Sequence, residues 1–245
     1  MCILFVLMSL LCNAQDAALF DQGNQSYASG DYQDAINSWS KVVSNGKQSS
    51  SLYFNLGNAY YKLNQIGPSV YNYEKALLLD PTNSDIKNNL AFAENARVDA
   101  IETLPKSVFS KWYEMISGQF SYEGWATGAV IFSFCFVILF LGYYFAVAER
   151  RKRMLFVTSI LSLLILFVAI AMAYQTYDDL IKDTPAIIFA ESTEVRGEPN
   201  MGSEASFTLH EGTKVQILTE EKDWVRIQIA DGKDGWMPLS DLKAL

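Results

Sequence analysis

Glu149-Arg150-Arg151-Lys152-Arg153 stands between two apolar runs, 124–148 and 154–177, and neither run contains a charged residue. Each run exceeds the ~20 residues that a helix needs to cross about 30 Å of hydrocarbon. The sequence therefore predicts a two-helix transmembrane hairpin with residues 149–153 as its connector. Because cytoplasmic loops carry an excess of Lys and Arg, we expect the connector in the cytoplasm and both flanking regions on the other side of the membrane.

Charge and side-chain chemistry exclude several classes of function. The 245-residue chain has a formal net charge of -8, and its cations cluster only in the connector, so a nucleic-acid partner is not expected. His210 is the single histidine, and no Cys, nucleophile or base forms a recognisable set with it. We expect no metal, no cofactor and no enzymatic activity, and we assign His210 a structural place at a strand end.

The first fourteen residues read as a secretory signal peptide. Residues 3–11 form an apolar block too short to span a bilayer, and Cys12-Asn13-Ala14 supplies a small residue at a cleavage site. A positively charged leading region is missing, which leaves the alternative of a retained short anchor. Lipidation of Cys12 is a further alternative, although Leu10-Leu11 does not suit such a site.

Residues 15–98 contain an internal repeat with a spacing of 34 residues. Gly23 matches Gly57, Asn24 matches Asn58, and Trp39 matches Tyr73. This period and pattern are those of the tetratricopeptide repeat, in which each unit is a pair of helices. We predict an all-α tetratricopeptide repeat domain of two repeats, with a helix from about residue 85 capping the apolar edge.

The tetratricopeptide resemblance places the first helix of each pair on a concave groove. Asn and aromatic side chains there suit an extended or helical peptide, through amide hydrogen bonds and flat apolar contact. A carboxylate clamp is not expected, because Phe20 and Phe54 stand where the clamp needs a Lys. The alternative is that the aromatics are core and the Asn residues are solvated. The candidate groove residues are Phe20, Asn24, Tyr27, Phe54, Asn55, Asn58, Tyr61, Lys62, Asn88 and Phe92.

The linker at residues 99–123 carries apolar side chains at spacings of three and four, which predicts an amphipathic helix. Trp112 and Tyr113 suit the headgroup boundary of a membrane, so we expect this helix on the outer membrane surface. The alternative is that the helix packs on the repeat domain.

Residues 178–245 change from a helical to a β pattern. Val215 and Ile217 alternate with polar residues, Val225, Ile227 and Ile229 do the same, and Gly residues mark the turns between them. This pattern predicts a C-terminal all-β barrel.

Several motifs of this region resemble a bacterial SH3 domain. They are Val195-Arg196-Gly197-Glu198-Pro199, residues 209–215, Asp223-Trp224-Val225-Arg226-Ile227 and residues 231–237. The resemblance implies an SH3-like barrel that binds cell-wall peptides or protein segments and catalyses nothing. Trp224 and Trp236 are either an exposed aromatic ledge for a ligand or part of the barrel core.

These parts make up a multidomain membrane protein, and their order resembles that in the BatE-like proteins of the Bacteroides aerotolerance (Bat) family. Tyr73–Pro81, Asp85–Leu90 and the basic connector carry the match. The resemblance implies a scaffold in a bacterial inner membrane, with periplasmic terminal domains, partners of the von Willebrand A type and a link to oxidative-stress tolerance. We therefore expect a non-enzymatic scaffold for membrane or envelope proteins. The competing interpretation is an envelope factor that binds peptidoglycan through its SH3 domain.

Overall fold

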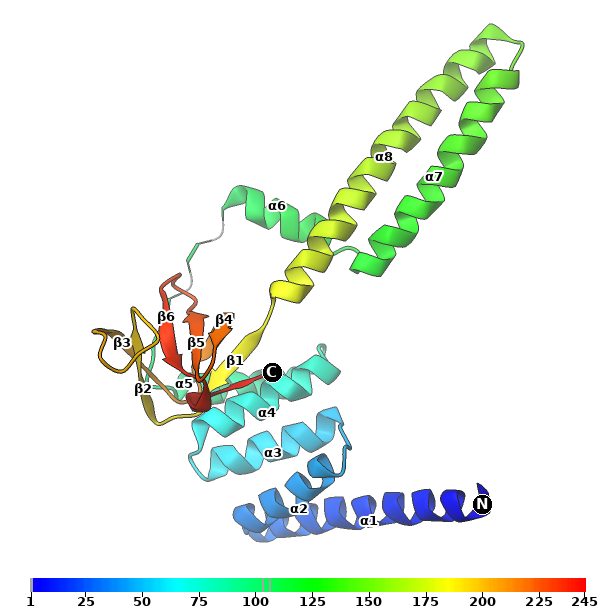
Figure 1. Cartoon of the computed structure of the whole chain (residues 1–245). Coiled ribbons are helices and arrows are strands. Elements are labelled where there is room, and N and C mark those ends of the chain that lie inside the picture. Colours follow the sequence, from blue (N-terminus) through cyan, green and yellow to red (C-terminus); the bar gives the residue numbers. More distant parts are fainter. Residues whose placement is uncertain (1, 103, 106) are drawn as a thin grey trace. The chain divides into compact units, whose positions relative to one another are not determined.

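The computed structural model describes residues 2–102, 104–105 and 107–245, with side chains from Gln15 onward (Figure 1). The chain divides into two compact units, of which the first joins Met1–Leu104 to Thr184–Leu245 and the second is Pro105–Asp183. The second unit is therefore an insertion in the first. We call residues 15–98 the repeat domain, 184–245 the sheet domain and Pro105–Asp183 the hairpin unit.

The repeat domain is a stack of helices in which each helix packs on the next along the chain (Figure 1). Ser49 and Asn83 start two of the helices, because each side-chain oxygen accepts hydrogen bonds from backbone N–H groups of the first turn. The helices are α1 (Cys2–Ser29), α2 (Tyr32–Ser44), α3 (Ser50–Lys62), α4 (Ile66–Leu79) and α5 (Ser84–Asn95).

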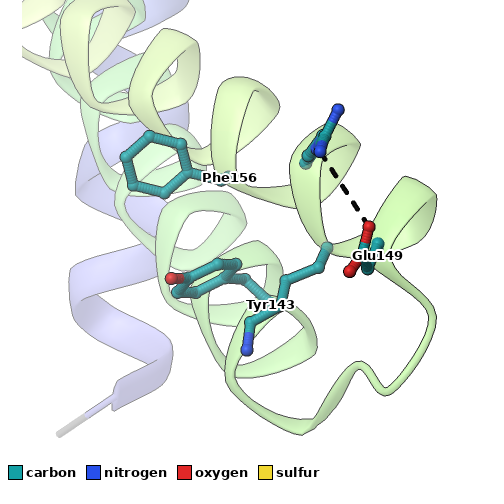
Figure 2. Close-up of a pocket in the computed structure, with 5 residues that line it drawn as sticks. Tyr143, Glu149 and Phe156 are labelled. Atoms are coloured by element: carbon teal, nitrogen blue, oxygen red, sulfur yellow. Dashed lines mark ion pairs between the residues drawn. The ribbon is translucent and has the colours of Figure 1, made fainter.

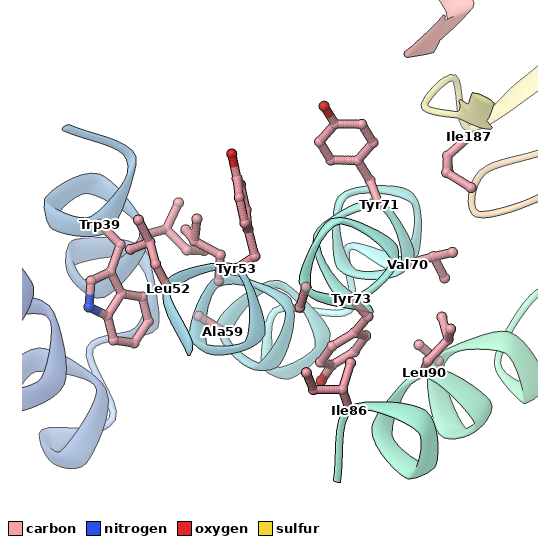
Figure 3. Close-up of a cluster of buried hydrophobic side chains, with 14 of the residues drawn as sticks. Trp39, Leu52, Tyr53, Ala59, Val70, Tyr71, Tyr73, Ile86, Leu90 and Ile187 are labelled. Atoms are coloured by element: carbon pink, nitrogen blue, oxygen red, sulfur yellow. The ribbon is translucent and has the colours of Figure 1, made fainter. Parts of the chain in front are cut away.

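Two glycines at equivalent places in the repeats admit two large rings, as the repeat spacing predicts. A Cβ atom on Gly23 would lie 2.3 Å from Trp39 Nε1, and one on Gly57 would lie 2.7 Å from the Tyr73 ring. Trp39 and Tyr73 are each 1% exposed and occupy the centre of the core (Figure 3). The two repeats and the α5 cap thus form as expected.

Helix α1 runs without a break through residue 14, where the signal peptide is predicted to end. The side chains of residues 1–14 lie outside the described residues, so the signal peptide stays a prediction.

Within the described residues, the sheet domain is one antiparallel sheet of seven strands in the order β3-β2-β6-β5-β4-β1-β7. Alternate side chains of the strands, including Val195, Val225, Ile227 and Met237, are fully buried in its core. This agrees with the predicted β pattern. The strands are β1 (Pro185–Ile188), β2 (Ser192–Arg196), β3 (Ala205–His210), β4 (Lys214–Glu221), β5 (Trp224–Gln228), β6 (Asp234–Pro238) and β7 (Leu242–Ala244).

Contacts between the repeat domain and the sheet domain make the first unit continuous. Ile187 of β1 is fully buried in the core cluster of the repeat domain, on the side of α4 (Figure 3). The rings of Tyr71 and Phe189 pack edge to face at 5.5 Å. At the first turn of α4, the Gly67 N–H donates a hydrogen bond of 3.0 Å to Glu211 Oε2.

The linker differs from the predicted helix in its first part. Residues 99–102 are not helical, because the sheet domain binds them: Asp99 accepts hydrogen bonds from the backbone N–H of His210 and from Thr213 Oγ1, both at 2.7 Å. Ile101 packs against the core of the sheet domain, and Leu104 N–H donates to Ala230 O at 3.2 Å. The predicted amphipathic helix is confined to α6 (Val108–Ser117).

The hairpin unit contains α6, α7 (Tyr122–Phe145) and α8 (Glu149–Lys182). The last two are long and apolar enough to cross a membrane, as the uncharged runs predict. Small side chains lie between them: Ala129, Ser159, Ser162 and Ala169 are buried, and Ser162 Oγ donates to Phe132 O at 3.0 Å.

The predicted connector at residues 149–153 is wrong in one respect. These residues form the first turns of α8, and the non-helical connection is residues 146–148. The helix starts there because Lys152 N–H donates to Ala148 O, and because a Glu in the first turn is favoured by the positive end of the helix dipole.

Candidate binding sites

A pocket of about 310 Å³ opens on the repeat domain. Its walls come from α1, α3, α4 and α5, so it exists only because the two repeats and the cap stack together. The lining residues are Tyr27, Asn58, Tyr61, Lys62, Tyr73, Asn89 and Phe92.

Asn58 is held in one orientation at this pocket. Its Oδ1 atom accepts hydrogen bonds from Tyr73 OH at 2.7 Å and from Asn89 Nδ2 at 2.8 Å. Burial raises the pKa of Tyr73, so its hydroxyl remains a donor at neutral pH. An amide oxygen has two lone pairs, and both are used here. Any further hydrogen bond from the Asn58 amide, including one to a ligand, would therefore be donated by its Nδ2–H groups.

The rim of the pocket adds a cation and two rings. Lys62 is exposed, Tyr61 is 37% exposed and Phe92 is 63% exposed. Amide and ammonium donors beside aromatic rings match a ligand that has carbonyl or carboxylate oxygens next to apolar side chains. These groups can hold a ligand by hydrogen bonds and apolar contact. Among residues 2–102, 104–105 and 107–245, no group of three or more His, Cys, Asp or Glu side chains could hold a metal ion.

The structure divides the predicted groove residues among several places. Tyr27, Asn58, Tyr61, Lys62 and Phe92 do meet in this pocket. Two residues that line it were not predicted as ligand contacts: Tyr73, which the repeat pattern assigned to packing, and Asn89.

Asn88 is exposed and is not among the lining residues, whereas its neighbour Asn89 is. The apolar spacing of α5 contains the signal that distinguishes them. Ile86 and Ala93 are buried, and position 89 lies three and four residues from them, on the same helical face. Position 88 falls on the solvent side.

The other predicted groove residues lie outside this pocket. Phe54 borders a second hollow of about 380 Å³ with Asp80, Asn83 and other residues at the start of α5. Asn55 Nδ2 donates to Asn24 Oδ1 at 3.3 Å, which ties the two repeats together. Phe20 is half-buried against the core, and its carbonyl accepts a hydrogen bond from Trp39 Nε1. The alternative assignment to the core therefore applies to Phe20.

Trp224 and Trp236 lie on the outer face of the sheet domain. Trp224 is paired with Pro238, and Trp236 with Arg226, in the register of β5 and β6. Their chain neighbours Val225 and Met237 are fully buried on the opposite face, whereas both Trp side chains are half-buried. The alternative assignment of these two residues to the barrel core is wrong.

Charged side chains flank this aromatic surface. Arg226 Nε donates to Asp234 Oδ2 at 2.7 Å, and Arg196, opposite Trp236 on β2, is paired with Glu194. A flat ring surface bordered by paired charges suits a ligand with both apolar and polar faces.

His210 lies at the end of β3, as predicted for a structural residue, and its Nδ1 is 2.8 Å from Asp99 Oδ1. Burial raises the pKa of Asp99, but the hydrogen bonds from His210 and Thr213 outweigh burial and hold this pKa below its usual value. His210 thus joins the linker to the sheet domain.

Comparison with known proteins identifies the two kinds of module. A family model of the tetratricopeptide repeat matches residues 50–83, a TPR repeat model matches residues 23–64, and a bacterial SH3 domain model matches residues 191–243. The chain contains tetratricopeptide repeats and a bacterial SH3 domain. The SH3 match lies within the sheet domain, which is therefore the SH3 domain of this chain.

Two solved structures share parts of the chain. An NlpC/P60 family protein from Bacillus cereus ATCC 10987 is similar at 14% identity over 29% of this chain and 23% of that chain, with a TM-score of 0.23. The first TPR of Spaghetti (RPAP3), bound to the HSP90 peptide SRMEEVD, is similar at 19% identity over 34% of this chain and 93% of that chain, also with a TM-score of 0.23. The chain thus spans less than a quarter of the first protein. No curated protein matches.

Proposed function

We propose that this protein is a membrane-anchored, non-enzymatic scaffold that binds protein partners through its tetratricopeptide pocket. The observation that carries the proposal is the fixed orientation of Asn58, whose oxygen is bound by Tyr73 and Asn89 so that its N–H groups serve a ligand. A scaffold also needs attachment, and α7 and α8 have the length and composition to supply it.

The expected ligand is an extended segment of a membrane or envelope protein. A backbone carbonyl or a carboxylate would accept hydrogen bonds from Asn58 Nδ2 and Lys62, while an apolar side chain would rest against Tyr61 and Phe92. The Bat-family resemblance narrows the partners to proteins of the von Willebrand A type. It also suggests a bacterial inner membrane, with both terminal domains in the periplasm, and a part in oxidative-stress tolerance.

Site-specific photo-crosslinking of the full chain in living cells tests this proposal. The crosslinking residue replaces Phe92 at the pocket rim, and a matched control replaces Leu78, which is 61% exposed on α4 and does not line the pocket. We expect one membrane or envelope protein to be captured from position 92 and not from position 78. The same captured proteins at both positions would refute the pocket as the binding site.

A second pair of variants tests the amide directly. Asn58→Ala removes the donor from the pocket, whereas Asn55→Ala removes an Asn of the same helix whose hydrogen bond goes to Asn24 instead. Capture at position 92 is expected to fall about tenfold with the first variant and to persist with the second, because a hydrogen bond to a charged group contributes about 1.5–3 kcal/mol. Equal capture with both would exclude a contribution from Asn58.

The second candidate function is peptidoglycan binding by the SH3 domain, favoured by the outward position of Trp224 and Trp236. Aromatic faces of this kind pack well on sugar rings. Co-sedimentation of the full chain with purified wall sacculi tests it, with Trp224→Ala as the variant and Trp112→Ala, an exposed Trp of α6, as the control. Loss of sedimentation only with the first variant would support this function, and failure of the unaltered chain to sediment would exclude it.

A further inference from the structure

A third pocket, of about 320 Å³, lies where α7 ends and α8 begins (Figure 2). Tyr143 comes from the last turn of α7, while Glu149, Lys152, Arg153 and Phe156 come from the first turns of α8. The ring centroids of Tyr143 and Phe156 are 5.4 Å apart, so two aromatic rings form an apolar wall at the end of the hairpin.

Cations border this wall. Lys152 Nζ lies 5.4 Å from the centre of the Tyr143 ring, a cation–π contact that keeps the ammonium group next to the apolar wall. Arg153 is 3.9 Å from Glu149, and both of their side chains are largely exposed, at 85% and 90%. Among the lining residues Lys152 and Arg153 stand against the single acid Glu149, so the rim of the pocket has a net positive charge.

The surroundings of the pocket are apolar beyond this charged rim. Phe145, Met154 and Val157 are 73%, 62% and 63% exposed around the same turns. The pocket therefore combines an anion-attracting edge with an aromatic wall at the boundary of a long apolar helix pair. Basic pockets between transmembrane helices are known to bind anionic lipid headgroups.

We propose that this pocket binds one anionic phospholipid. The headgroup phosphate lies between Lys152 and Arg153, and the glycerol and upper acyl chain rest against Tyr143 and Phe156. A free phosphate ion would satisfy the cations but leave the aromatic wall without a partner, so the charge and the wall together favour a lipid. The proposal rests on the membrane anchor of the proposed function and does not depend on the tetratricopeptide pocket.

Native mass spectrometry of the detergent-purified full chain tests the proposal. The probes are phosphatidylglycerol and phosphatidylcholine with identical acyl chains. We expect one phosphatidylglycerol molecule to be retained and phosphatidylcholine to be lost. In Lys152→Gln/Arg153→Gln, retention is expected to fall by about tenfold or more, because each Lys or Arg near an anionic lipid contributes about a factor of five.

The matched control is Arg150→Gln/Arg151→Gln, which makes the same change in charge in the same helical turn but alters no lining residue. Retention of the lipid by this control supports the pocket. Equal loss from both double variants would overturn the proposal, because the cations of residues 149–153 would then attract anions without a pocket. Equal retention of both lipids, or displacement of phosphatidylglycerol by excess inorganic phosphate, would overturn it too.

Failure here is separable from failure of the proposed scaffold. Resistance of the chain to alkaline extraction from membranes reports the anchor alone, and crosslinking from position 92 reports the tetratricopeptide pocket alone. A chain that resists extraction and crosslinks its partner but retains no phosphatidylglycerol would refute only the lipid site.

Discussion

The repeat domain and the α7–α8 pair both pack helix against helix, but they bury opposite kinds of side chain. In the repeat domain the largest rings are inside, with Trp39 and Tyr73 each 1% exposed. Between α7 and α8 the buried residues are Ala129 and small Ser and Ala side chains, while Phe134 is 65% exposed. Water drives large apolar groups inward, whereas lipid gives no such drive and leaves close packing to small residues. The side chains at the helix contacts are therefore of the size expected in water for the repeat domain and of the size expected in lipid for the α7–α8 pair.

The largest effect is expected at the boundary between the repeat domain and the SH3 domain. Ile187→Ala removes a fully buried side chain from the core of the repeat domain and should lower the free energy of unfolding by about 2–5 kcal/mol. Ile131→Ala, at a position 55% exposed on α7, should change it by less than about 0.5 kcal/mol. Urea unfolding of the full chain in mild detergent measures both. Similar losses of unfolding free energy in the two variants would contradict the difference between the repeat domain and the α7–α8 pair.

The next largest difference in stability is expected when a glycine is replaced by alanine in the repeat domain and in the α7–α8 pair. In Gly57→Ala the new methyl group would lie 2.7 Å from the buried Tyr73 ring, and overpacking of this kind costs about 1–3 kcal/mol. At Gly128 in α7 a Cβ atom meets nothing within 4 Å, so Gly128→Ala should be neutral or stabilising. Hydrogen exchange of the full chain at rising temperature, read separately in the repeat domain and in α7, compares them. Destabilisation by Gly128→Ala but not by Gly57→Ala would reverse the comparison.

Asp99 tests whether the first unit is held together by polar contacts as well. Asp99→Ala removes the acceptor for His210 N–H and Thr213 Oγ1 and should cost about 1–3 kcal/mol at neutral pH. Because the pKa of Asp99 is lowered by folding, its contribution is present above the usual Asp pKa of about 3.9 and is lost as the pH falls through the folded-state value.

The free energy of unfolding, measured from neutral to acid pH, should therefore become equal in the unaltered chain and in Asp99→Ala below about pH 4. Glu102→Ala, at an exposed acid of the same segment, serves as the control and should follow the unaltered chain. A constant gap between Asp99→Ala and the unaltered chain across this range would exclude the carboxylate as its cause.

The smallest effect concerns the ion pair between Lys214 and Glu74, at 2.7 Å. The Lys214 side chain is 43% exposed, so solvent screening limits the pair to at most about 1 kcal/mol. Lys214→Ala should lower the unfolding midpoint slightly at low salt and not at all at high salt. A salt-independent loss larger than about 2 kcal/mol would show that burial of Glu74 dominates.

Local patterns in the sequence were sufficient for the separate modules. The spacing of Gly23 and Gly57, opposite Trp39 and Tyr73, is a packing rule that repeats with the chain, so both repeats could be predicted. The alternation of Trp224 with Val225 already places the Trp on the outer face of its strand, since successive side chains point to opposite sides. That signal was available in the sequence and favours the aromatic ledge over the barrel core.

Contacts between distant segments explain what could not be predicted. Asp99 and Ile101 have helical spacing with the residues that follow, but three hydrogen bonds from residues more than a hundred positions later hold Asp99 in a non-helical segment. The place of Ile187 in the core of the repeat domain depends equally on tertiary contact. Asn89 was missed for a local reason: choosing between two adjacent Asn residues requires the exact phase of a short helix.

The insertion of the hairpin unit in the first unit has a consequence for the order of synthesis. Residues up to about 97 emerge first, yet the side chain that completes their core, Ile187, is ninety positions later in the chain. At about 5–20 residues per second, the ribosome needs roughly 5–20 seconds to supply it. During that interval the nascent repeat domain exposes apolar surface while the hairpin unit is being synthesised. A chaperone that shields this edge would act in a time window set by the length of the hairpin.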